Sequence, residues 1–223
     1  MKMKPSLVPT RAFTLVEILT VISIMAIMIA VSGPAIRGLT GANTINKAAS
    51  DISQTLELTR SQAMAGRTPI RAAIGELPPA PGRITPSTVV LILRPADGSL
   101  EADTPADMAN AAKWPLLFKP LVLENLVVRD DLNATDPDTA ADANPADSDI
   151  GAFTRTVPGL ADVKFTTFIQ FDPSGEVRVR KGEAVRHIKL ALDRPAPQDD
   201  KNPFLLRLSG INGTVRVLRK ENL

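Results

Sequence analysis

Carboxylates and cations gather at four places in this chain of 223 residues, and each place suggests a different chemistry. Glu17 is the single charged residue of an apolar run, residues 13–31. Asp172 and Glu176 stand four apart, as paired carboxylates for hydrolysis could. Seven aspartates crowd residues 130–149, where a hard cation such as Ca²⁺ would find oxygen ligands. Basic residues gather late in the chain, where a polyanion could bind.

Catalytic chemistry has little support in these patterns. His187 is the only histidine, cysteine is absent, and no serine stands in a Gly-x-Ser-x-Gly context, so neither a usual metal site nor a catalytic triad can be assembled. We interpret His187 as a surface residue of a strand. Asp172 and Glu176 belong to "DPSGE", where Asp, Pro and Gly are favoured for turn geometry. We therefore expect no enzyme, no cofactor and no metal.

The aspartates lie in an acidic block between two mildly basic parts of the chain. Residues 95–150 hold twelve Asp and Glu against three Lys and Arg. The stretch "DDLNATDPDTAADANPADSD" is rich in Asp, Ala and Pro and does not match the ligand spacing of an EF-hand loop. This composition favours a flexible insertion at about 130–150 over a calcium site.

The late basic residues alternate with apolar ones. Arg178 and Arg180 share one face of a predicted strand, and Arg216, Arg219 and Lys220 end the chain's last basic cluster. The last three are our candidates for salt-sensitive phosphate contacts. With one tryptophan and no tyrosine, stacking on bases has little support, so a solvated strand face is the favoured interpretation and we do not expect nucleic acid as a partner.

The apolar run is long enough to cross a membrane. At about 1.5 Å per residue a helix over 13–31 nearly spans a hydrocarbon core of about 30 Å. Lys2, Lys4 and Arg11 precede it without an acid, which predicts a cytoplasmic N-terminus and an extracytoplasmic remainder. A cleaved secretory signal and a plain signal anchor both fit this pattern, but neither accounts for Glu17, because an acid within a membrane helix is costly and usually functional.

The order of residues in "RAFTLVEILTVISIMAIMIAVSGP" resembles the prepilin-type cleavage and methylation motif of type IV pilins and type II secretion pseudopilins. The resemblance implies that prepilin peptidase cuts between Ala12 and Phe13 and that the new amine of Phe13 is methylated. Ala12 departs from the glycine usual before the cut. Glu17 would then neutralise the Phe13 amine of a neighbouring subunit in a filament, whereas an unpaired subunit would keep the burial penalty.

Pro34 stands where many pilins carry a helix-kinking proline. Alternatively, Gly33-Pro34 simply ends the membrane helix. Beyond it, residues 35–65 predict an amphipathic helix that stops near Gly66, with one apolar stripe that consists of Ile36, Leu39, Ile45, Ala49, Ile52, Leu56 and Ala63.

The rest of the chain predicts hairpin-length strands in an antiparallel sheet, or two packed sheets, on the helix end. The predicted strands are 87–93, 115–123, 125–130, 163–171, 176–180, 185–192, 204–209 and 214–219. The words "LELTRSQAMAGRTPIRAAI", "FDPSGEVRV" and "SGINGTVRVLR" resemble the pseudopilin H and FimT-like minor subunits, and the chain also resembles, less closely, the pilin-like proteins of the Verru_Chthon cassette.

Together these patterns predict an α+β, pilin-like fold with a long N-terminal helix, its first half membrane-spanning, packed on an antiparallel β-sheet head. The predicted parts are a leader (1–12), a transmembrane and assembly helix (13–34), an amphipathic extension (35–65) and a β-rich extracytoplasmic head (66–223).

The resemblance implies a structural minor pilin or pseudopilin, single-pass in the inner membrane with its head in the periplasm. Its implied partners are prepilin peptidase, other pilin subunits, the platform protein and membrane lipids. A DNA-binding minor pilin of an uptake system and a signal-anchored periplasmic binding domain are the alternatives.

Overall fold

The structure, a computed structural model, describes residues 14–79, 85–100, 104–129, 142–183, 185–195 and 203–219, without the side chains of 31–43 and 219. The predicted leader, 1–12, lies outside these residues. The chain divides into two compact units, 1–46 and 47–223. Helix α1 (Leu15–Gly66) contributes residues to both.

Helix α1 continues through Pro34, so the alternative in which Gly33-Pro34 ends a helix is wrong. A proline in a helix interior removes one backbone hydrogen bond, but the helical hydrogen bonds before and after it can keep the helix continuous. The helix ends at Gly66, as predicted, and Arg67 follows with a left-handed φ of 47°. Within the described part of the chain, no helix has the length and hydrophobicity needed to span a membrane.

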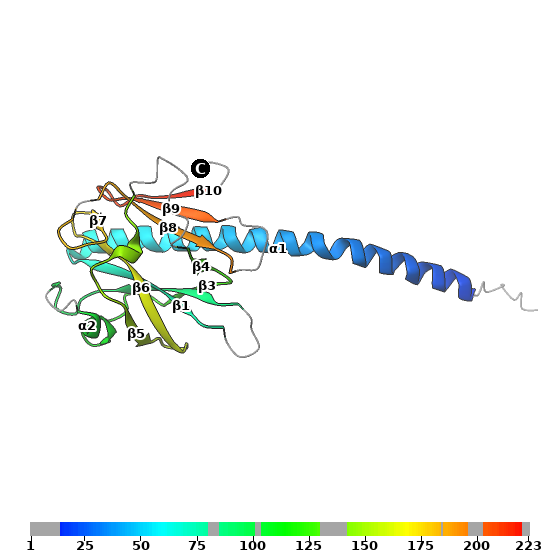
Figure 1. Ribbon diagram of the computed structural model, residues 1–223, viewed down its shortest axis with the longest axis horizontal. Coiled ribbons are helices and arrows are strands. Elements are labelled where there is room, and N and C mark those ends of the chain that lie inside the picture. Colours follow the sequence, from blue (N-terminus) through cyan, green and yellow to red (C-terminus); the bar gives the residue numbers. More distant parts are fainter. Residues whose placement is uncertain are drawn as a thin grey trace, which may run out of the picture. The chain divides into compact units, whose positions relative to one another are not determined.

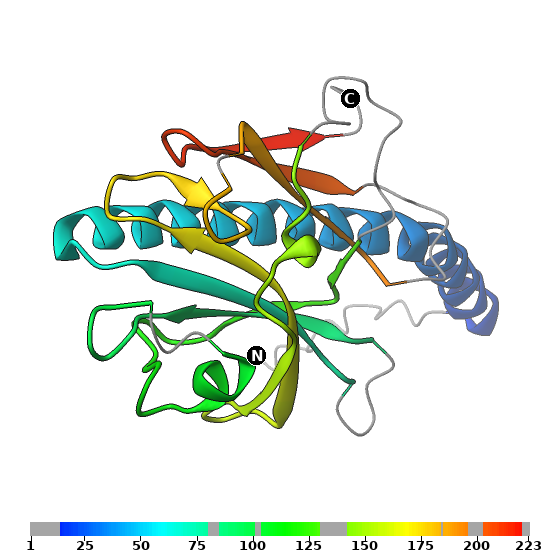
Figure 2. The same cartoon turned by 60° about the vertical axis from the view of Figure 1, so that its left-hand side comes forward.

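The second unit is built around the C-terminal part of α1. Of the predicted stripe within this unit, Ile52, Leu56 and Ala63 are fully buried, and Ala49 is nearly so. Figures 1 and 2 show this part of the helix, in cyan, running between two antiparallel sheets. Of the two predicted alternatives, one antiparallel sheet or two packed sheets on the helix end, the structure has two sheets. Ile36 and Leu39 belong to the range whose side chains are not described.

The larger sheet has six strands in the described residues, in the order β3-β2-β1-β6-β5, with β7 also paired to β6. A bulge interrupts the β1–β6 pair between Ile74 and Gly75. A Cβ at Gly75 would lie 2.4 Å from the carbonyl oxygen of Lys164, so glycine is required at this close approach. The bounds are β1 (Ile70–Leu77), β2 (Ser87–Leu93), β3 (Leu121–Glu124), β5 (Phe153–Thr156), β6 (Asp162–Phe171) and β7 (Val177–Arg178).

As far as the structure describes the chain, the smaller sheet has four strands, in the order β10-β9-β8-β4. Its edge strand is tied to the helix by a hydrogen bond from the backbone N–H of Val215 to Glu57 Oε1, 2.8 Å long. The bounds are β4 (Val127–Val128), β8 (His187–Asp193), β9 (Phe204–Ser209) and β10 (Val215–Arg219).

The strands predicted over 115–123 and 125–130 are much shorter in the structure, where only β3 and β4 form. Pro115 and Pro120 lack the N–H that a ladder needs, and residue 125 takes a left-handed φ of 63°. The sequence patterns also missed β5, helix α2 (Pro105–Ala109) and the 3₁₀ turn η1 (Pro145–Asp147). Thr104 caps α2 by accepting a hydrogen bond from the N–H of Asp107.

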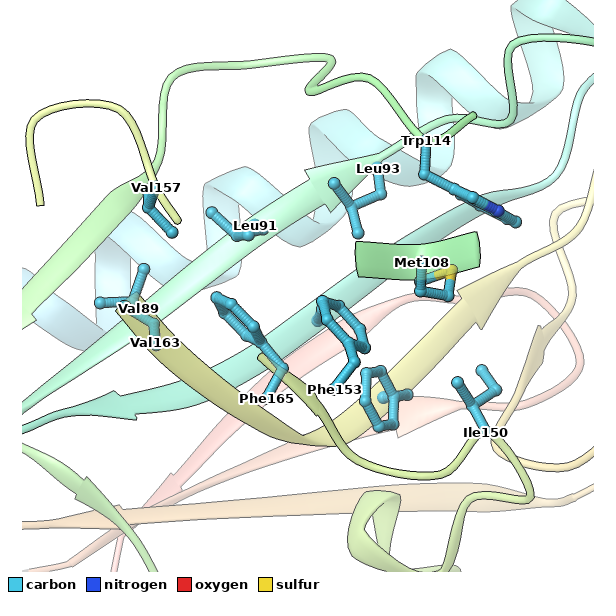
Figure 3. Close-up of a cluster of buried hydrophobic side chains, with 12 residues drawn as sticks. Val89, Leu91, Leu93, Met108, Trp114, Ile150, Phe153, Val157, Val163 and Phe165 are labelled. Atoms are coloured by element: carbon cyan, nitrogen blue, oxygen red, sulfur yellow. The ribbon is translucent and has the colours of Figure 1, made fainter. Parts of the chain in front are cut away.

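An apolar cluster fills the space between the larger sheet and the α2 segment (Figure 3). Phe165 is fully buried in it, with its ring centroid 5.2 Å from that of Phe153. Trp114 and Met108 close the cluster from the α2 side and are also fully buried. Buried Arg155 anchors this segment by donating from Nη1 to the carbonyl oxygen of Trp114 at 2.7 Å.

Phe165→Ala is expected to lower the free energy of unfolding by about 3–5 kcal/mol, because it opens a cavity in this cluster. Denaturant unfolding of the full chain in neutral detergent, followed by the fluorescence of Trp114, measures the change. Ile211→Ala is the matched control, since Ile211 is 73% exposed and its loss should change stability by less than about 0.5 kcal/mol. Equal effects of the two substitutions would contradict this account of the core.

Candidate assembly helix and basic sheet face

The N-terminal part of α1 exposes apolar side chains on every side. Eleven large hydrophobic residues between Leu15 and Ile29 are about half exposed or more, from 49% at Val21 to 78% at Leu15. A helix that is apolar all round is normally buried in a core or in lipid. Exposed apolar area of this extent marks a surface that binds protein or membrane.

The first turn of this helix is closed by Thr14 and Glu17. The backbone N–H and the hydroxyl of Thr14 each donate to Glu17 Oε2 at 2.9 Å, and the N–H of Glu17 donates back to Thr14 Oγ1 at 3.3 Å. This reciprocal arrangement is a capping box, in which two backbone donors of the helix end are satisfied at once.

Glu17 therefore has a partner within its own chain, which the sequence reasoning missed. The signal was present, because "TLVE" before an apolar run is the Thr-x-x-Glu signature of a capping box. The cost assigned to Glu17 in a single subunit is consequently smaller than the sequence analysis expected. Ala12 and Phe13, the two residues of the predicted cleavage site, lie outside the described residues, as does the side chain of Pro34.

Thr14→Ala is expected to cost about 1 kcal/mol of local helix stability, because the box loses its hydroxyl. Amide hydrogen exchange at Glu17 and Ile18, measured on the full chain in detergent, should accelerate about fivefold. Thr14→Ser keeps the hydroxyl and should exchange as the parent does. Unchanged exchange in Thr14→Ala would show that the box does not hold this turn.

Asp172 and Glu176 of "DPSGE" belong to a turn and form ion pairs with Arg178. The N–H of Gly175 donates to the carbonyl oxygen of Asp172 at 2.9 Å, and Gly175 takes a left-handed φ of 88°. Arg178 lies 2.7 Å from a carboxylate oxygen of both Asp172 and Glu176. The hydrogen bond to Glu176 and the charge of Asp172 raise the pKa of Arg178. The prediction that these two acids form a turn is confirmed.

Several of the late basic residues are already bonded within the head. Arg178 pairs as above, and Arg180 donates from Nε to the carbonyl oxygen of Asp147 at 2.8 Å. Lys189 is only 6% exposed. The expectation that Arg178 and Arg180 form a solvated face therefore holds only in part, because the chain's own oxygens occupy both side chains.

A buried carboxylate organises the outer face of the smaller sheet. Asp142 is only 4% exposed in its side chain and pairs with Arg207: Arg207 Nη2 donates to Asp142 Oδ1 at 3.0 Å, and Arg207 Nε lies 2.8 Å from Asp142 Oδ2 in an ion pair. His187 Nδ1 lies 3.6 Å from Asp142 Oδ1 and 3.3 Å from Arg207 Nη2. Burial and then the charge of Arg207 lower the pKa of His187, against the opposite effect of Asp142. His187 is thus half-buried in a polar cluster and not a plain strand surface residue.

The described end of the acidic insertion belongs to the fold. Ala143 bridges β8 in parallel, since its N–H donates to the carbonyl oxygen of His187 at 2.9 Å and its own carbonyl accepts from the N–H of Lys189 at 3.0 Å. Asp149 accepts from the N–H of Lys181. In residues 142–150 the backbone and the acids Asp142 and Asp149 are thus bonded to the head, while 130–141 lie outside the described residues, and the flexible insertion at about 130–150 stays a prediction.

Of the three candidate nucleic-acid contacts, only Arg216 has a described side chain. It is exposed on β10, directly opposite Arg207 on β9. Lys220 and the side chain of Arg219 lie outside the described residues. Where the structure describes the chain, no group of three or more His, Asp or Glu side chains could hold a metal ion.

His187 should make the head less stable in acid. The unfolded chain binds a proton on this imidazole below about pH 6.5, whereas the folded chain keeps it neutral to lower pH, so the free energy of unfolding falls as pH decreases through that window. The charges facing it are Arg207, Asp142, Arg186 and Arg216. His187→Asn should reduce the loss of Tm between about pH 7.5 and about pH 5.5. Identical pH dependence in the two proteins would contradict the assignment.

Comparisons with known proteins add no assignment, since no family model, no curated protein and no solved structure matches the chain.

Proposed function

We propose that the chain is a structural minor pilin or pseudopilin, assembled through its N-terminal helix into a type II secretion-like or type IV pilus-like filament. In this proposal the apolar run 13–31 anchors the chain in the inner membrane, with the leader in the cytoplasm and the head in the periplasm. Prepilin peptidase cuts after Ala12 and the amine of Phe13 is methylated. The chain has no catalytic role of its own.

The exposed apolar part of α1 is the observation that carries the proposal. Eleven large apolar side chains left open to solvent need lipid or neighbouring helices to cover them. A filament of packed helices supplies that cover, and a bilayer supplies it before assembly. The described head, which is an α+β unit with α1 between antiparallel sheets, suits a subunit that is displayed outside the membrane.

Glu17 would have two partners in turn. In a single subunit its carboxylate accepts from Thr14, and the burial cost of the charge is partly offset by those hydrogen bonds. In a filament the methylated amine of Phe13 on a neighbouring subunit adds a full opposite charge in a low-dielectric setting. Assembly is then favoured because the ion pair with the Phe13 amine stabilises the Glu17 carboxylate more than the hydrogen bonds of the capping box do.

The proposed partners follow from this mechanism. Prepilin peptidase and membrane lipids meet the N-terminal segment before assembly, and other pilin or pseudopilin subunits and the platform protein meet it during assembly. The role proposed is that of a minor subunit like pseudopilin H and the FimT-like proteins, on the resemblance of "LELTRSQAMAGRTPIRAAI", "FDPSGEVRV" and "SGINGTVRVLR".

Mass spectrometry of the mature N-terminus tests the processing step. We expect the chain to begin at a methylated Phe13 when the gene is expressed together with a prepilin peptidase. A chain that keeps Met1 would overturn the pilin proposal and favour a signal-anchored periplasmic domain. Cleavage after Ser32 or Gly33 would favour an ordinary secretory signal.

The charge of Glu17 and its capping role can be separated by substitution. Glu17→Gln keeps a side chain that completes a capping box but removes the charge, whereas Thr14→Ala removes the capping partner but keeps the charge. We expect Glu17→Gln and Glu17→Ala to be processed yet left out of filaments, as counted in sheared filament fractions, and Thr14→Ala to be incorporated. Incorporation of Glu17→Gln at the parent level would rule out charge pairing as the assembly force.

A DNA-binding minor pilin is the second candidate, and exposed Arg216 favours it. It predicts that the full chain in detergent retards DNA at low salt and that substituting Arg216, Arg219 and Lys220 together abolishes the retardation.

A further inference from the structure

The outer face of the smaller sheet carries a row of cations. The register sets Lys189 on β8 opposite Arg207 on β9, and Arg207 opposite Arg216 on β10. Like charges directly opposite each other on one face destabilise a sheet unless an anion lies between them.

The carboxylate of Asp142 lies beside this row and is already engaged. Arg207 Nη2 donates a hydrogen bond to Asp142 Oδ1 at 3.0 Å, and Arg207 Nε lies 2.8 Å from Asp142 Oδ2 in an ion pair. Arg216 is exposed, and no hydrogen bond or ion pair joins its guanidinium to another described residue. The face therefore keeps a positive charge beside Arg207 that the described chain does not neutralise.

A small pocket opens at this point, with a volume of about 220 Å³. It is lined by His187, Arg207, Ser209, Asn212, Thr214, Arg216 and Leu218. Its volume lies below the range of about 300–1,000 Å³ typical of sites for drug-sized molecules. A ligand of a few heavy atoms fits it better than a large one.

The pocket offers more donors than acceptors. Asn212 Oδ1 is occupied by the N–H of Thr214 at 3.2 Å and its hydroxyl at 2.9 Å, which leaves the two donors of the Asn212 side-chain amide. His187 Nδ1 faces Arg207 Nη2 at 3.3 Å, so the neutral ring accepts there and carries its proton on Nε2. With the guanidinium of Arg216, the lining offers the N–H donors that a multi-oxygen anion accepts from.

We propose that this pocket binds a small oxyanion of the phosphate class, free phosphate or a phosphomonoester, between Arg207 and Arg216. Asp142 orients Arg207, and Asn212 supplies neutral donors from the β9–β10 turn. The site does not depend on the pilin proposal, since it uses only residues of the folded head and the end of the acidic insertion.

His187 is the only histidine of the chain and reports on this site without interference. The full chain is labelled with ¹³C-histidine, purified with a histidine-free tag in neutral detergent, and titrated by NMR in phosphate and in chloride of equal ionic strength. A bound oxyanion favours the imidazolium, so phosphate should move the midpoint of the His187 titration upward by about one pH unit.

Arg216→Gln should abolish this response, and Lys119→Gln, which removes one exposed positive charge elsewhere in the head, should keep it. Both residues are exposed, so both variants should fold, which circular dichroism checks. The same midpoint in phosphate and chloride, or an unchanged response in Arg216→Gln, would overturn the proposal.

Separate titrations with glycerol phosphate and with inorganic phosphate show whether the ligand is a phosphomonoester or free phosphate. Tighter binding of the ester identifies an organic phosphate as the ligand, and tighter binding of the inorganic ion identifies free phosphate. A protein that keeps Met1 but shows the phosphate response would overturn the pilin proposal while leaving the pocket intact.

Discussion

The burial of one helical stripe is the constraint on which the head depends. Ile52, Leu56 and Ala63 have no exposed surface, because strands of both sheets cover the C-terminal part of α1 (Figure 2). Neither sheet could bury its inner face alone, since each is amphipathic and needs an apolar partner. The hydrogen bond from Val215 to Glu57 adds a polar tie between the edge strand and the same helix.

The same helix has a second apolar stretch that the described fold leaves exposed. Residues 15–29 expose apolar side chains with Glu17 as the one charge, whereas beyond residue 47 α1 buries one apolar stripe and is otherwise mostly polar, apart from exposed Leu58 and Met64. Helix α1 thus has two different patterns of hydrophobicity. We base the proposed division between membrane segment and head on this change of pattern.

Within the described residues, some arginines of the head have carboxylate partners nearby, and others do not. Arg178 forms ion pairs with Asp172 and Glu176 of one turn, and Arg207 forms an ion pair with Asp142, which lies at the far end of the acidic insertion. Arg216 lies next to Arg207 without such a partner in the described residues. Arg178 and Arg207 have carboxylate partners and form structural ion pairs. Arg216 has none in the described residues, which is why we assign the candidate anion site to it.

The sequence by itself determined the features that are local. Gly66 and the residues after it ended α1 where expected, the alternating strands from 163 and 204 formed, and "DPSGE" made its turn, because each depends on propensity and periodicity within a few residues. The capping box was also local, and its Thr-x-x-Glu signature was legible in "TLVE". Tertiary structure alone decided that Asp142 would be buried against Arg207 and His187 and that Arg216 would stand opposite Arg207. Asp142 lies 65 positions from Arg207 and 45 from His187, and the Arg207–Arg216 pair depends on the register of a sheet, so composition does not record which of these residues will meet.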